Sequence, residues 1–285
     1  MRYLVLGGSG IVGRAVVAEA ARRGADVTPR SRAETDITSR GEVARAIAAS
    51  RPDLVVNCAA FTAVDRCESE RERAFAVNGE AVGVVAEETA RAGARLIHLS
   101  TDYVFDGAGS EPYAEDHPTA PRSVYGASKL AGEELALARK GSLVVRTSWI
   151  FGSGGPNFVD AIAGKLRAGE RSLRVVADQR GGPTYAPFLA SALLDLGEWG
   201  VDGIVHYQNR PVVSWFELAA SIARELGSGA EVVPVSTAEV PRPAPRPAYS
   251  VLSVERFERR AARSVEAWSE GLKRHLAERD KGVTE

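Results

Sequence analysis

A glycine-rich turn near the N-terminus sets narrow limits on how the chain begins to fold. Tyr3-Leu4-Val5-Leu6 is a short apolar run, and an amphipathic helical pattern covers residues 11–23. The turn between them carries Gly7, Gly10 and Gly13. A strand, a glycine turn and a helix in this order let backbone N–H groups approach a pyrophosphate at the helix N-terminus. The order therefore predicts a dinucleotide site, with a plain glycine-rich turn as the alternative.

Short apolar runs recur along the first half of the chain and alternate with helical patterns. The further expected strands are residues 25–28, 54–57, 95–99 and 143–147. This alternation is typical of an α/β fold with a doubly wound parallel sheet, the Rossmann fold. The alternation weakens after Ser148. We therefore expect residues 1–148 to form an NAD(P)-binding Rossmann domain to which segments near 174–207 return, and residues 149–285 to form mainly a smaller, interleaved C-terminal substrate-binding lobe.

Two further stretches carry groups suited to carbonyl chemistry. Tyr125-Gly126-Ala127-Ser128-Lys129 places a phenol and an ammonium group one helical turn apart. Tyrosine has an ordinary pKa near ~10, and a fixed cation beside it favours the phenolate and lowers that pKa. Ser100-Thr101-Asp102 follows an apolar strand, at the edge where an open parallel sheet binds its ligands. With the glycine turn, these stretches predict an enzyme that transfers a hydride between a nicotinamide and a carbonyl.

The composition bears on partners and location. The chain has 285 residues, 45% of them hydrophobic and 26% charged, with a net charge of -1. We therefore expect neither a nucleic-acid nor a membrane partner. Cys58 and Cys67 are the two cysteines, and they offer neither a disulfide framework nor metal-ligand spacing. With no leader pattern before the first strand, we expect a cytoplasmic protein with reduced thiols and no metal.

The ends of the second and third strands bear on the cofactor. An acid at the end of the second strand would bond the adenine-ribose hydroxyls of NADH, but this chain has Arg30, whose guanidinium matches the extra phosphate of NADPH. We predict NADPH, with NADH as the alternative cofactor and a solvated Arg30 as the alternative role. Asp36 either caps the helix that begins near Ser39 or bonds an adenine amino group. Cys58-Ala59-Ala60-Phe61-Thr62 supplies small residues that leave room for a ligand.

Four other features have both structural and functional interpretations. His98 alternates with apolar neighbours, which favours a core histidine over a ligand. Asn78 lies between two helical patterns, residues 65–77 and 80–92, and is interpreted first as a cap, with support of the site from behind as the alternative. Trp149, just past the fifth strand, fits a substrate contact or a core position. The proline-rich residues 241–247 favour an ordered connection over a ligand for a partner protein.

Motifs spread over nearly the whole chain point to one family. Besides the glycine turn, they are residues 57–65, 100–107, 125–133, 146–149, 157–159, 178–184 and 246–250. Thr-Asp-Tyr-Val-Phe-Asp-Gly and Asp-Gln-x-Gly-x-Pro-Thr are the most specific of them. With these motifs the chain resembles the extended short-chain dehydrogenases/reductases, and among them most closely the dTDP-4-dehydrorhamnose reductases.

The resemblance implies reduction of the C4 ketone of a dTDP-4-keto-6-deoxyhexose, most closely dTDP-4-dehydro-L-rhamnose to dTDP-L-rhamnose. Tyr125 would be the general acid, Lys129 would lower its pKa and hold the nicotinamide ribose, and Thr101 would donate to the carbonyl oxygen. Asp102 and Trp149 would contact the sugar nucleotide. The implied cofactor contacts are Gly10, Ile11, Val12, Asp36, Ile37, Ala60, Phe61 and Thr62, and Gly7, Gly13, Arg30, Ala59, Tyr125 and Lys129 complete the expected cofactor site.

The chain departs from some relatives, and other functions stay open. Some relatives dimerise through a divalent metal held partly by a Glu in the first helix, where this chain has Ala15, so we carry over neither the metal nor that dimer. A monomer and a homodimer both remain open. Related dehydratases place an Asp-Glu pair after the threonine, whereas Tyr103 follows Asp102 here. The alternatives are a 4-ketoreductase for another deoxysugar nucleotide in secondary metabolism and a non-catalytic subunit resembling the methionine adenosyltransferase beta subunit.

Overall fold

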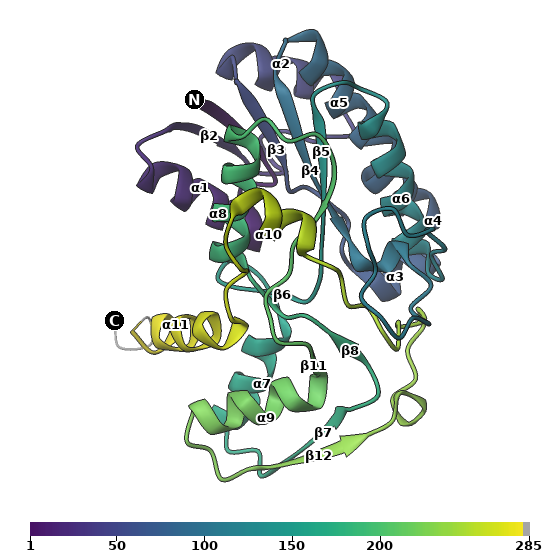
Figure 1. Ribbon diagram of the computed structural model, residues 1–285, viewed down its shortest axis with the longest axis vertical. Helices are drawn as coiled ribbons and strands as arrows, with labels where there is room; N and C mark the ends of the chain where they lie inside the picture. The colour runs from purple at the N-terminus through teal and green to yellow at the C-terminus, as the bar shows by residue number, and fades with distance from the viewer. Residues whose placement is uncertain (282–285) are drawn as a thin grey trace.

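Six strands form the central sheet, in the upper part of Figure 1. Their spatial order is β10 (Gly203–His206), β5 (Ser142–Thr147), β4 (Arg95–Thr101), β3 (Leu54–Asn57), β1 (Arg2–Leu6) and β2 (Asp26–Arg30). Every neighbouring pair is parallel. The chain runs outward in opposite directions from β1 and β3, so the carboxyl ends of these two strands flank the place where open sheets bind ligands. The structure, a computed structural model that describes residues 1–281, confirms the expected doubly wound α/β sheet.

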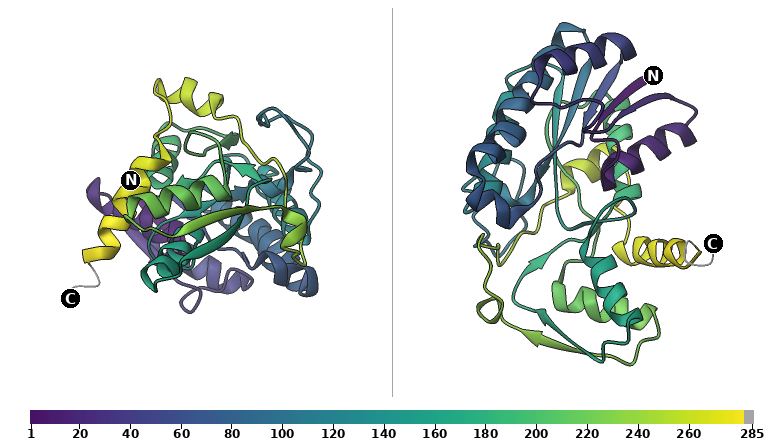
Figure 2. Two further views of the ribbon diagram at one scale, coloured as in Figure 1. Left: turned by 90° about the horizontal axis from the view of Figure 1, so that it is seen from below. Right: turned by 180° about the vertical axis from the view of Figure 1, so that it is seen from behind.

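Helices cover both faces of this sheet. One face packs against α1 (Ile11–Arg22), α8 (Ala186–Glu198) and α10 (Glu255–Ala261), and the other against α2 (Arg40–Ser50), α5 (Ala81–Arg91) and α6 (Val124–Leu137). The view from behind in Figure 2 shows the sheet between the two layers. Because water reaches neither face, β3 and β5 are buried at every position, and each contains a Leu-Val-Val run in which apolar residues do not alternate with polar ones.

The segment between β3 and β4 differs from the two helices expected there. The first of them is divided into α3 (Val64–Ser69) and α4 (Arg71–Phe75), because Glu70 leaves helical geometry at φ -114° and ψ 46°. A single π-helical turn, η1 (Ala76–Glu80), then leads into α5. Such turns often occur at functional sites, and this one contains Asn78.

A smaller lobe lies below the sheet in Figure 1. Its two longer strands, β7 (Ser172–Val176) and β12 (Glu231–Val235), pair in parallel. A separate hydrophobic core joins them to the surrounding helices, α7 (Phe158–Arg167), α9 (Trp215–Glu225) and α11 (Trp268–Lys281). Residues 282–285 of the expected lobe lie outside the described residues.

The chain passes between the two parts more than once. It leaves the sheet after β5 through β6 (Ile150–Phe151), which pairs with β9 (Thr184–Tyr185). It returns with α8 and β10, so β7 belongs to the lobe and the return begins later than residue 174. It leaves again through β11 (Val213–Ser214), which pairs with β8 (Arg180–Gly181), and returns with α10.

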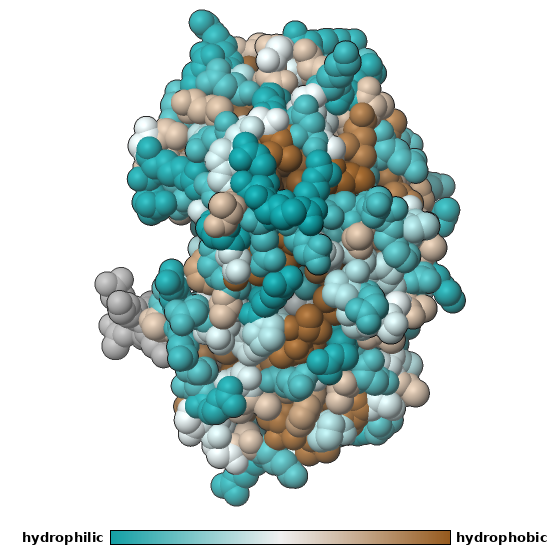
Figure 3. Space-filling view, viewed as in Figure 1, coloured by the Kyte–Doolittle hydropathy of each residue, from teal (hydrophilic) through white to brown (hydrophobic). Residues whose placement is uncertain are grey.

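The proline-rich residues 241–247 form an ordered connection that lies against the N-terminal domain. Arg246 and the Ala244 backbone N–H both bond Asp65 on α3. On the face shown in Figure 3, hydrophilic residues predominate and hydrophobic residues form separate patches. Among the described residues, no helix combines the length and apolar character that crossing a membrane requires.

Candidate active site

The glycine turn joins β1 to the N-terminus of α1 in a tight loop. A side chain at Gly13 would place its Cβ 2.1 Å from the Gly7 carbonyl oxygen, so the loop can close only around glycine. Gly10 stands at the N-cap without a side-chain cap, and the first turn of α1 holds no acidic residue. The helix therefore leaves uncapped N–H groups and a positive end with no competing carboxylate, which suits a cofactor phosphate.

The loop after β3 forms the neighbouring wall and is held by two buried asparagines. Asn78 accepts a hydrogen bond from the Phe61 N–H at 2.7 Å and donates to the Phe61 carbonyl at 3.0 Å. It also donates to the Ser128 hydroxyl, which donates in turn to the Tyr125 carbonyl. The cap interpretation of Asn78 is therefore wrong, since its side chain connects this loop to α6. Asn57 accepts from the Ala59 N–H at 3.1 Å.

At the end of β2, Arg30 carries no hydrogen bond or ion pair on its side chain among residues 1–281. Glu34 lies close to it. Two hydrogen bonds from Ser31 hold the pKa of Glu34 low, and the charge of Arg30 lowers it further. Asp36 accepts bonds from Thr38 within a turn, while Ser39 occupies the N-cap position of α2, so Asp36 does not cap that helix. The Ile37 side chain is buried in the core, which leaves only its backbone for a ligand.

Tyr125 and Lys129 lie on α6, whose N-terminus is capped by the Ser123 hydroxyl. The helix packs closely on η2 (Asp102–Val104), because Gly126 has no side chain where a Cβ would lie 2.1 Å from the Tyr103 carbonyl. Lys129 is 2% exposed, and its Nζ donates to the Leu99 carbonyl at 2.6 Å. Burial lowers the pKa of Lys129 to about 8, against an opposing effect of Glu133.

The structure reverses the expected direction of the Tyr125 pKa. Burial raises the pKa of this phenol and the charge of Asp102 raises it further, while the Thr101 hydroxyl acts in the opposite direction. These groups have the largest effects on this pKa, and the Lys129 amine is bonded to the Leu99 carbonyl of β4. Tyr125 is therefore a neutral phenol at physiological pH, the form that a proton donor needs.

Thr101 and Asp102 are buried together at the end of β4. The Thr101 hydroxyl donates to Asp102 Oδ1 at 2.9 Å and accepts from the Tyr103 N–H. The second carboxylate oxygen, Oδ2, is buried without a hydrogen-bond partner among the described residues. Burial raises the pKa of Asp102 to about 6, although hydrogen bonding from neighbouring groups lowers it. The Ser250 hydroxyl, besides Thr101, acts on this carboxylate, so Asp102 is a buried acceptor with a further hydroxyl beside it.

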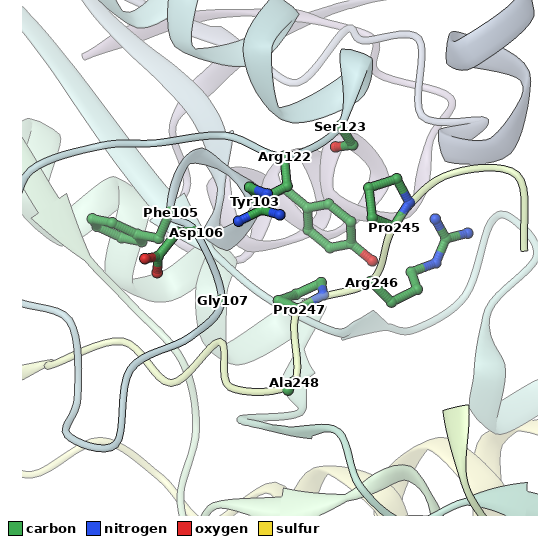
Figure 4. Close-up of a pocket in the computed structure, with 10 residues that line it drawn as sticks. All are labelled: Tyr103, Phe105, Asp106, Gly107, Arg122, Ser123, Pro245, Arg246, Pro247 and Ala248. Carbon is green, nitrogen blue, oxygen red and sulfur yellow. The ribbon is translucent and has the colours of Figure 1, made fainter. Parts of the chain in front are cut away.

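Two cavities lie between the lobes, and Tyr103 lines both of them, whereas Thr101, Asp102, Tyr125 and Lys129 line neither. One, of about 230 Å³, lies between Tyr103 and the proline-rich connection; Figure 4 shows its lining residues, with the Tyr103 hydroxyl directed toward Arg246 and Pro247. The other, of about 300 Å³, shares Tyr103 and Arg246 and extends over the smaller lobe. The Tyr103 ring is edge-on to Tyr125 at 5.6 Å between centroids, which connects the cavities to the catalytic candidates.

The larger cavity is lined by cationic and aromatic side chains: Arg174, Arg242, Arg246, Trp215 and Phe158. The three arginines are paired with carboxylates of the protein. Arg246 and Arg242 pair with Asp65 at 2.9 and 3.8 Å, and Arg174 pairs with Glu239 at 2.7 Å. These pairs are partly exposed, so a polyanionic ligand can compete for the arginines.

Trp149 stacks on Trp215, with 3.5 Å between centroids and 6° between planes. Its other neighbour is Gly181, where a Cβ would lie 2.5 Å from the indole. Trp149 does not line either cavity; it supports Trp215, which does. The sequence analysis missed Trp215 and singled out none of the cavity arginines for a role. The proline-rich residues 241–247 and the motif at residues 246–250 were the signals that could have drawn attention to Arg242 and Arg246.

His98 is a buried histidine, as its alternation indicated, but it also contacts the catalytic candidates. Its Nε2 lies 3.2 Å from Lys129 Nζ, and its Nδ1 lies 3.3 Å from Asn57 Nδ2. No group of three or more His, Cys, Asp or Glu side chains in residues 1–281 is arranged to hold a metal ion.

Comparisons with known proteins agree with this geometry. The family model of the RmlD substrate binding domain matches residues 1–280. A dTDP-4-dehydrorhamnose reductase from Streptomyces griseus is 44% identical over 95% of this chain and 91% of its own. A probable dTDP-4,6-dihydroxy-2-methyloxan-3-one 4-ketoreductase from Streptomyces antibioticus is 41% identical over 96% of this chain and 94% of its own.

A solved structure shares the whole architecture. The dTDP-4-dehydrorhamnose reductase from Bacillus anthracis, in complex with NADP, superposes with a TM-score of 0.93 and 35% identity, over 97% of this chain and 99% of its own. Since the family model spans nearly all of the chain and the relatives match at near full length, the chain belongs to the RmlD substrate binding domain family.

Proposed function

We propose that the chain is an oxidoreductase that uses NADPH to reduce the C4 ketone of dTDP-4-dehydro-L-rhamnose to dTDP-L-rhamnose. Membership of the RmlD family and the names of the relatives support this activity. The observation that carries it is the burial of Thr101, Asp102 and Lys129 near Tyr125 at the carboxyl end of the sheet, with Tyr103 joining this group to a cavity lined by arginines.

The cofactor side is formed mainly by backbone groups and small side chains. The uncapped start of α1 and the Gly7–Gly13 turn fit a pyrophosphate, and the Ala59–Thr62 loop forms the adjoining wall. Arg30, whose side chain makes no hydrogen bond or ion pair among residues 1–281, suits the phosphate that distinguishes NADPH from NADH. Bound NADPH supplies the hydride that reaches the C4 carbon. A cytoplasmic location fits this cofactor and the two free thiols.

The proton comes from Tyr125. Its raised pKa keeps the phenol protonated, so the hydroxyl can transfer its proton to the C4 oxygen as negative charge develops there. Thr101 can turn its hydroxyl from Asp102 toward the same oxygen, because a hydroxyl hydrogen rotates to suit its acceptor. Lys129 orients the nicotinamide ribose from the floor of the site.

The substrate side takes a nucleotide sugar, with no nucleic acid or membrane partner, in a monomer or a homodimer. The diphosphate would bind among Arg174, Arg242 and Arg246, and the thymine would stack on Trp215. Asp102 Oδ2, which lacks a partner among the described residues, would accept a hydrogen bond from a sugar hydroxyl. Trp149 would act through Trp215 and at the edge of the sugar site.

A second substrate has an observation in its favour. The Streptomyces antibioticus relative is a probable 4-ketoreductase for a different dTDP-linked ketosugar, and its identity to this chain is nearly as high as that of the rhamnose enzyme. The same catalytic groups would serve both reactions, because each reduces a ring ketone of a sugar that is linked to a nucleotide diphosphate.

The test is turnover of the purified chain with NADPH and a panel of dTDP-4-keto-6-deoxyhexoses. We expect NADPH oxidation only when a 4-keto sugar nucleotide is present, with dTDP-4-dehydro-L-rhamnose giving the highest kcat/KM. NMR of the product would show the configuration at C4. A higher kcat/KM for another sugar of the panel would favour the second substrate, and no turnover with any of them would overturn the assignment as a reductase.

A further inference from the structure

A buried line of polar groups runs behind Lys129, away from the cavities. Lys129 Nζ lies 3.2 Å from His98 Nε2, and His98 Nδ1 lies 3.3 Å from Asn57 Nδ2. Asn57 Oδ1 accepts from the Ala59 N–H at 3.1 Å. Asn57 and His98 are both completely buried, so no water competes for these contacts. The line connects the amine of α6 to the loop expected to bind the cofactor.

The hydrogens along this line can be placed by following donors and acceptors. The Ala59 N–H is a backbone donor and cannot change role, so it requires the oxygen of Asn57 and fixes the orientation of that amide. The Asn57 NH₂ group then faces His98 Nδ1 and must donate to it. A neutral imidazole has one donor and one acceptor nitrogen, so His98 carries its proton on Nε2.

The Nε2 proton points at Lys129. A neutral amine has a lone pair that accepts this proton, while one of its own hydrogens bonds the Leu99 carbonyl at 2.6 Å. An ammonium group has three donors and no acceptor. It would require His98 to accept at Nε2 and to carry its proton on Nδ1, facing the NH₂ group of Asn57. One of the two contacts is therefore lost whenever Lys129 is charged.

We propose that Asn57 and His98 are positioning residues that favour the neutral amine of Lys129 in the free enzyme. They would thereby determine the alkaline pH above which activity decreases. This inference deepens the proposed function and rests on the role of Lys129 in it. The other groups that face the amine are the Cys58 thiol beyond β3, and Glu133 on α6, which is neutralised by its buried pair with Arg146 at 2.7 Å. The lowered pKa of Lys129, due first to burial, agrees with the hydrogen-bond pattern.

The tautomer can be read directly on the free wild-type protein by ¹⁵N NMR with labelled histidine. The chain has four histidines, and His98→Gln identifies the His98 signals by their loss. At a pH above about 8, where the Lys129 amine is neutral, we expect a neutral ring with its proton on Nε2. A proton on Nδ1, or a charged ring, would overturn the proposal. Since this measurement needs neither cofactor nor substrate, it does not depend on whether the proposed reaction is correct.

Asn57→Asp tests the coupling. A carboxylate can still accept from Ala59 and can accept only from a protonated Nδ1, so we expect the His98 proton to move to Nδ1 and Nε2 to accept from the ammonium. The ammonium form of Lys129 then persists to higher pH. The alkaline limb of kcat/KM, which reports the free enzyme, should therefore shift upward by roughly one pH unit or more. Asn209→Asp is the matched control: Asn209 is also completely buried, but it bonds Tyr185 and Tyr207.

We expect Asn209→Asp to leave both the tautomer and the alkaline limb unchanged. If Asn57→Asp lowers stability but moves neither, the line is only structural and the proposal is wrong. If Asn57→Asp does not fold, the wild-type NMR measurement still decides the tautomer.

Discussion

The candidate site has two halves, the buried carboxyl end of the sheet and the larger cavity, and they present polar groups in opposite ways. At the sheet edge, Thr101, Asp102 and Lys129 are at most 5% exposed, and burial shifts the pKa values of the two ionisable groups among them. In the larger cavity, the side chains of Arg174 and Arg242 are 62% and 57% exposed and each pairs with a carboxylate. Buried groups respond strongly to the loss of one partner, whereas exposed pairs contribute little and are screened by salt. The first half is thus suited to proton chemistry and the second to holding a charged ligand.

The largest effect should come from the buried half. Tyr125→Phe removes the proton donor and retains the ring that packs edge-on against Tyr103. We expect kcat to fall by about 10² to 10⁴, because positioned general acid catalysis has that value. The measurement is kcat at saturating NADPH and ketosugar, with thermal unfolding as the control for folding. A variant within about tenfold of the parent would exclude Tyr125 as the acid.

Asp102→Asn should separate stability from activity. The pKa of Asp102 is raised from 3.8 to about 6, so the folded state binds the proton more tightly than the unfolded state. Its contribution is therefore favourable at low pH and is lost as pH rises from 3.8 to about 6. At 1.36 kcal/mol per pKa unit, the loss is about 3 kcal/mol.

We expect the variant to gain up to about this free energy of unfolding at neutral pH, and to gain little at a pH near 4. Its kcat/KM should fall, because the free carboxylate oxygen is gone. Urea unfolding at both pH values measures the difference. An equal stability change at the two pH values would mean that the unpaired charge is not its source.

Arg30→Asp extends the comparison to a partly exposed charge on the cofactor side. A charge-assisted phosphate contact contributes roughly 1.5 to 3 kcal/mol, so kcat/KM should shift from NADPH toward NADH by about tenfold or more. Arg32→Asp, two residues further on, is the matched control and should shift the ratio less. An unchanged ratio of kcat/KM values in Arg30→Asp would show that Arg30 is a solvated side chain.

Asp65→Asn should have the smallest effect, on substrate binding alone. It removes a competing negative charge from Arg242 and Arg246 while retaining an oxygen that can accept from Arg246. We expect KM for the ketosugar to fall by about two- to fivefold at low salt with kcat unchanged, since such partly exposed pairs contribute up to about 1 kcal/mol. Glu217→Gln is the control, because it breaks an ion pair with Arg180, which lines neither cavity. A higher KM would mean that Asp65 positions the arginines rather than competing for them.

The sequence predicted the buried half of the candidate site better than the larger cavity, for physical reasons. A glycine turn, a strand-end Thr-Asp pair and a helical Tyr-Lys spacing are local patterns, and each is held by the element in which it lies. Arg174, Trp215 and Arg242 come from separate parts of the chain and meet only after the lobe has folded. The same limit applied to Asn78 and His98. The partners of Asn78 lie 17 and 50 residues away in the chain, and those of His98 lie 31 and 41 residues away. The direction of the Tyr125 pKa depended on burial and on Asp102, which helix spacing cannot express.

The repeated passage of the chain between the sheet and the lobe limits how relatives can be recombined. A fragment that stopped after β5 would lack α8 and β10, and with them one edge strand and a run of completely buried leucines. Exchange of the substrate lobe between family members therefore cannot use a single junction. A chimera would need breakpoints after β5, on either side of the α8–β10 return, and before α10. Specificity in this architecture is more readily changed by substituting cavity side chains than by exchanging whole segments.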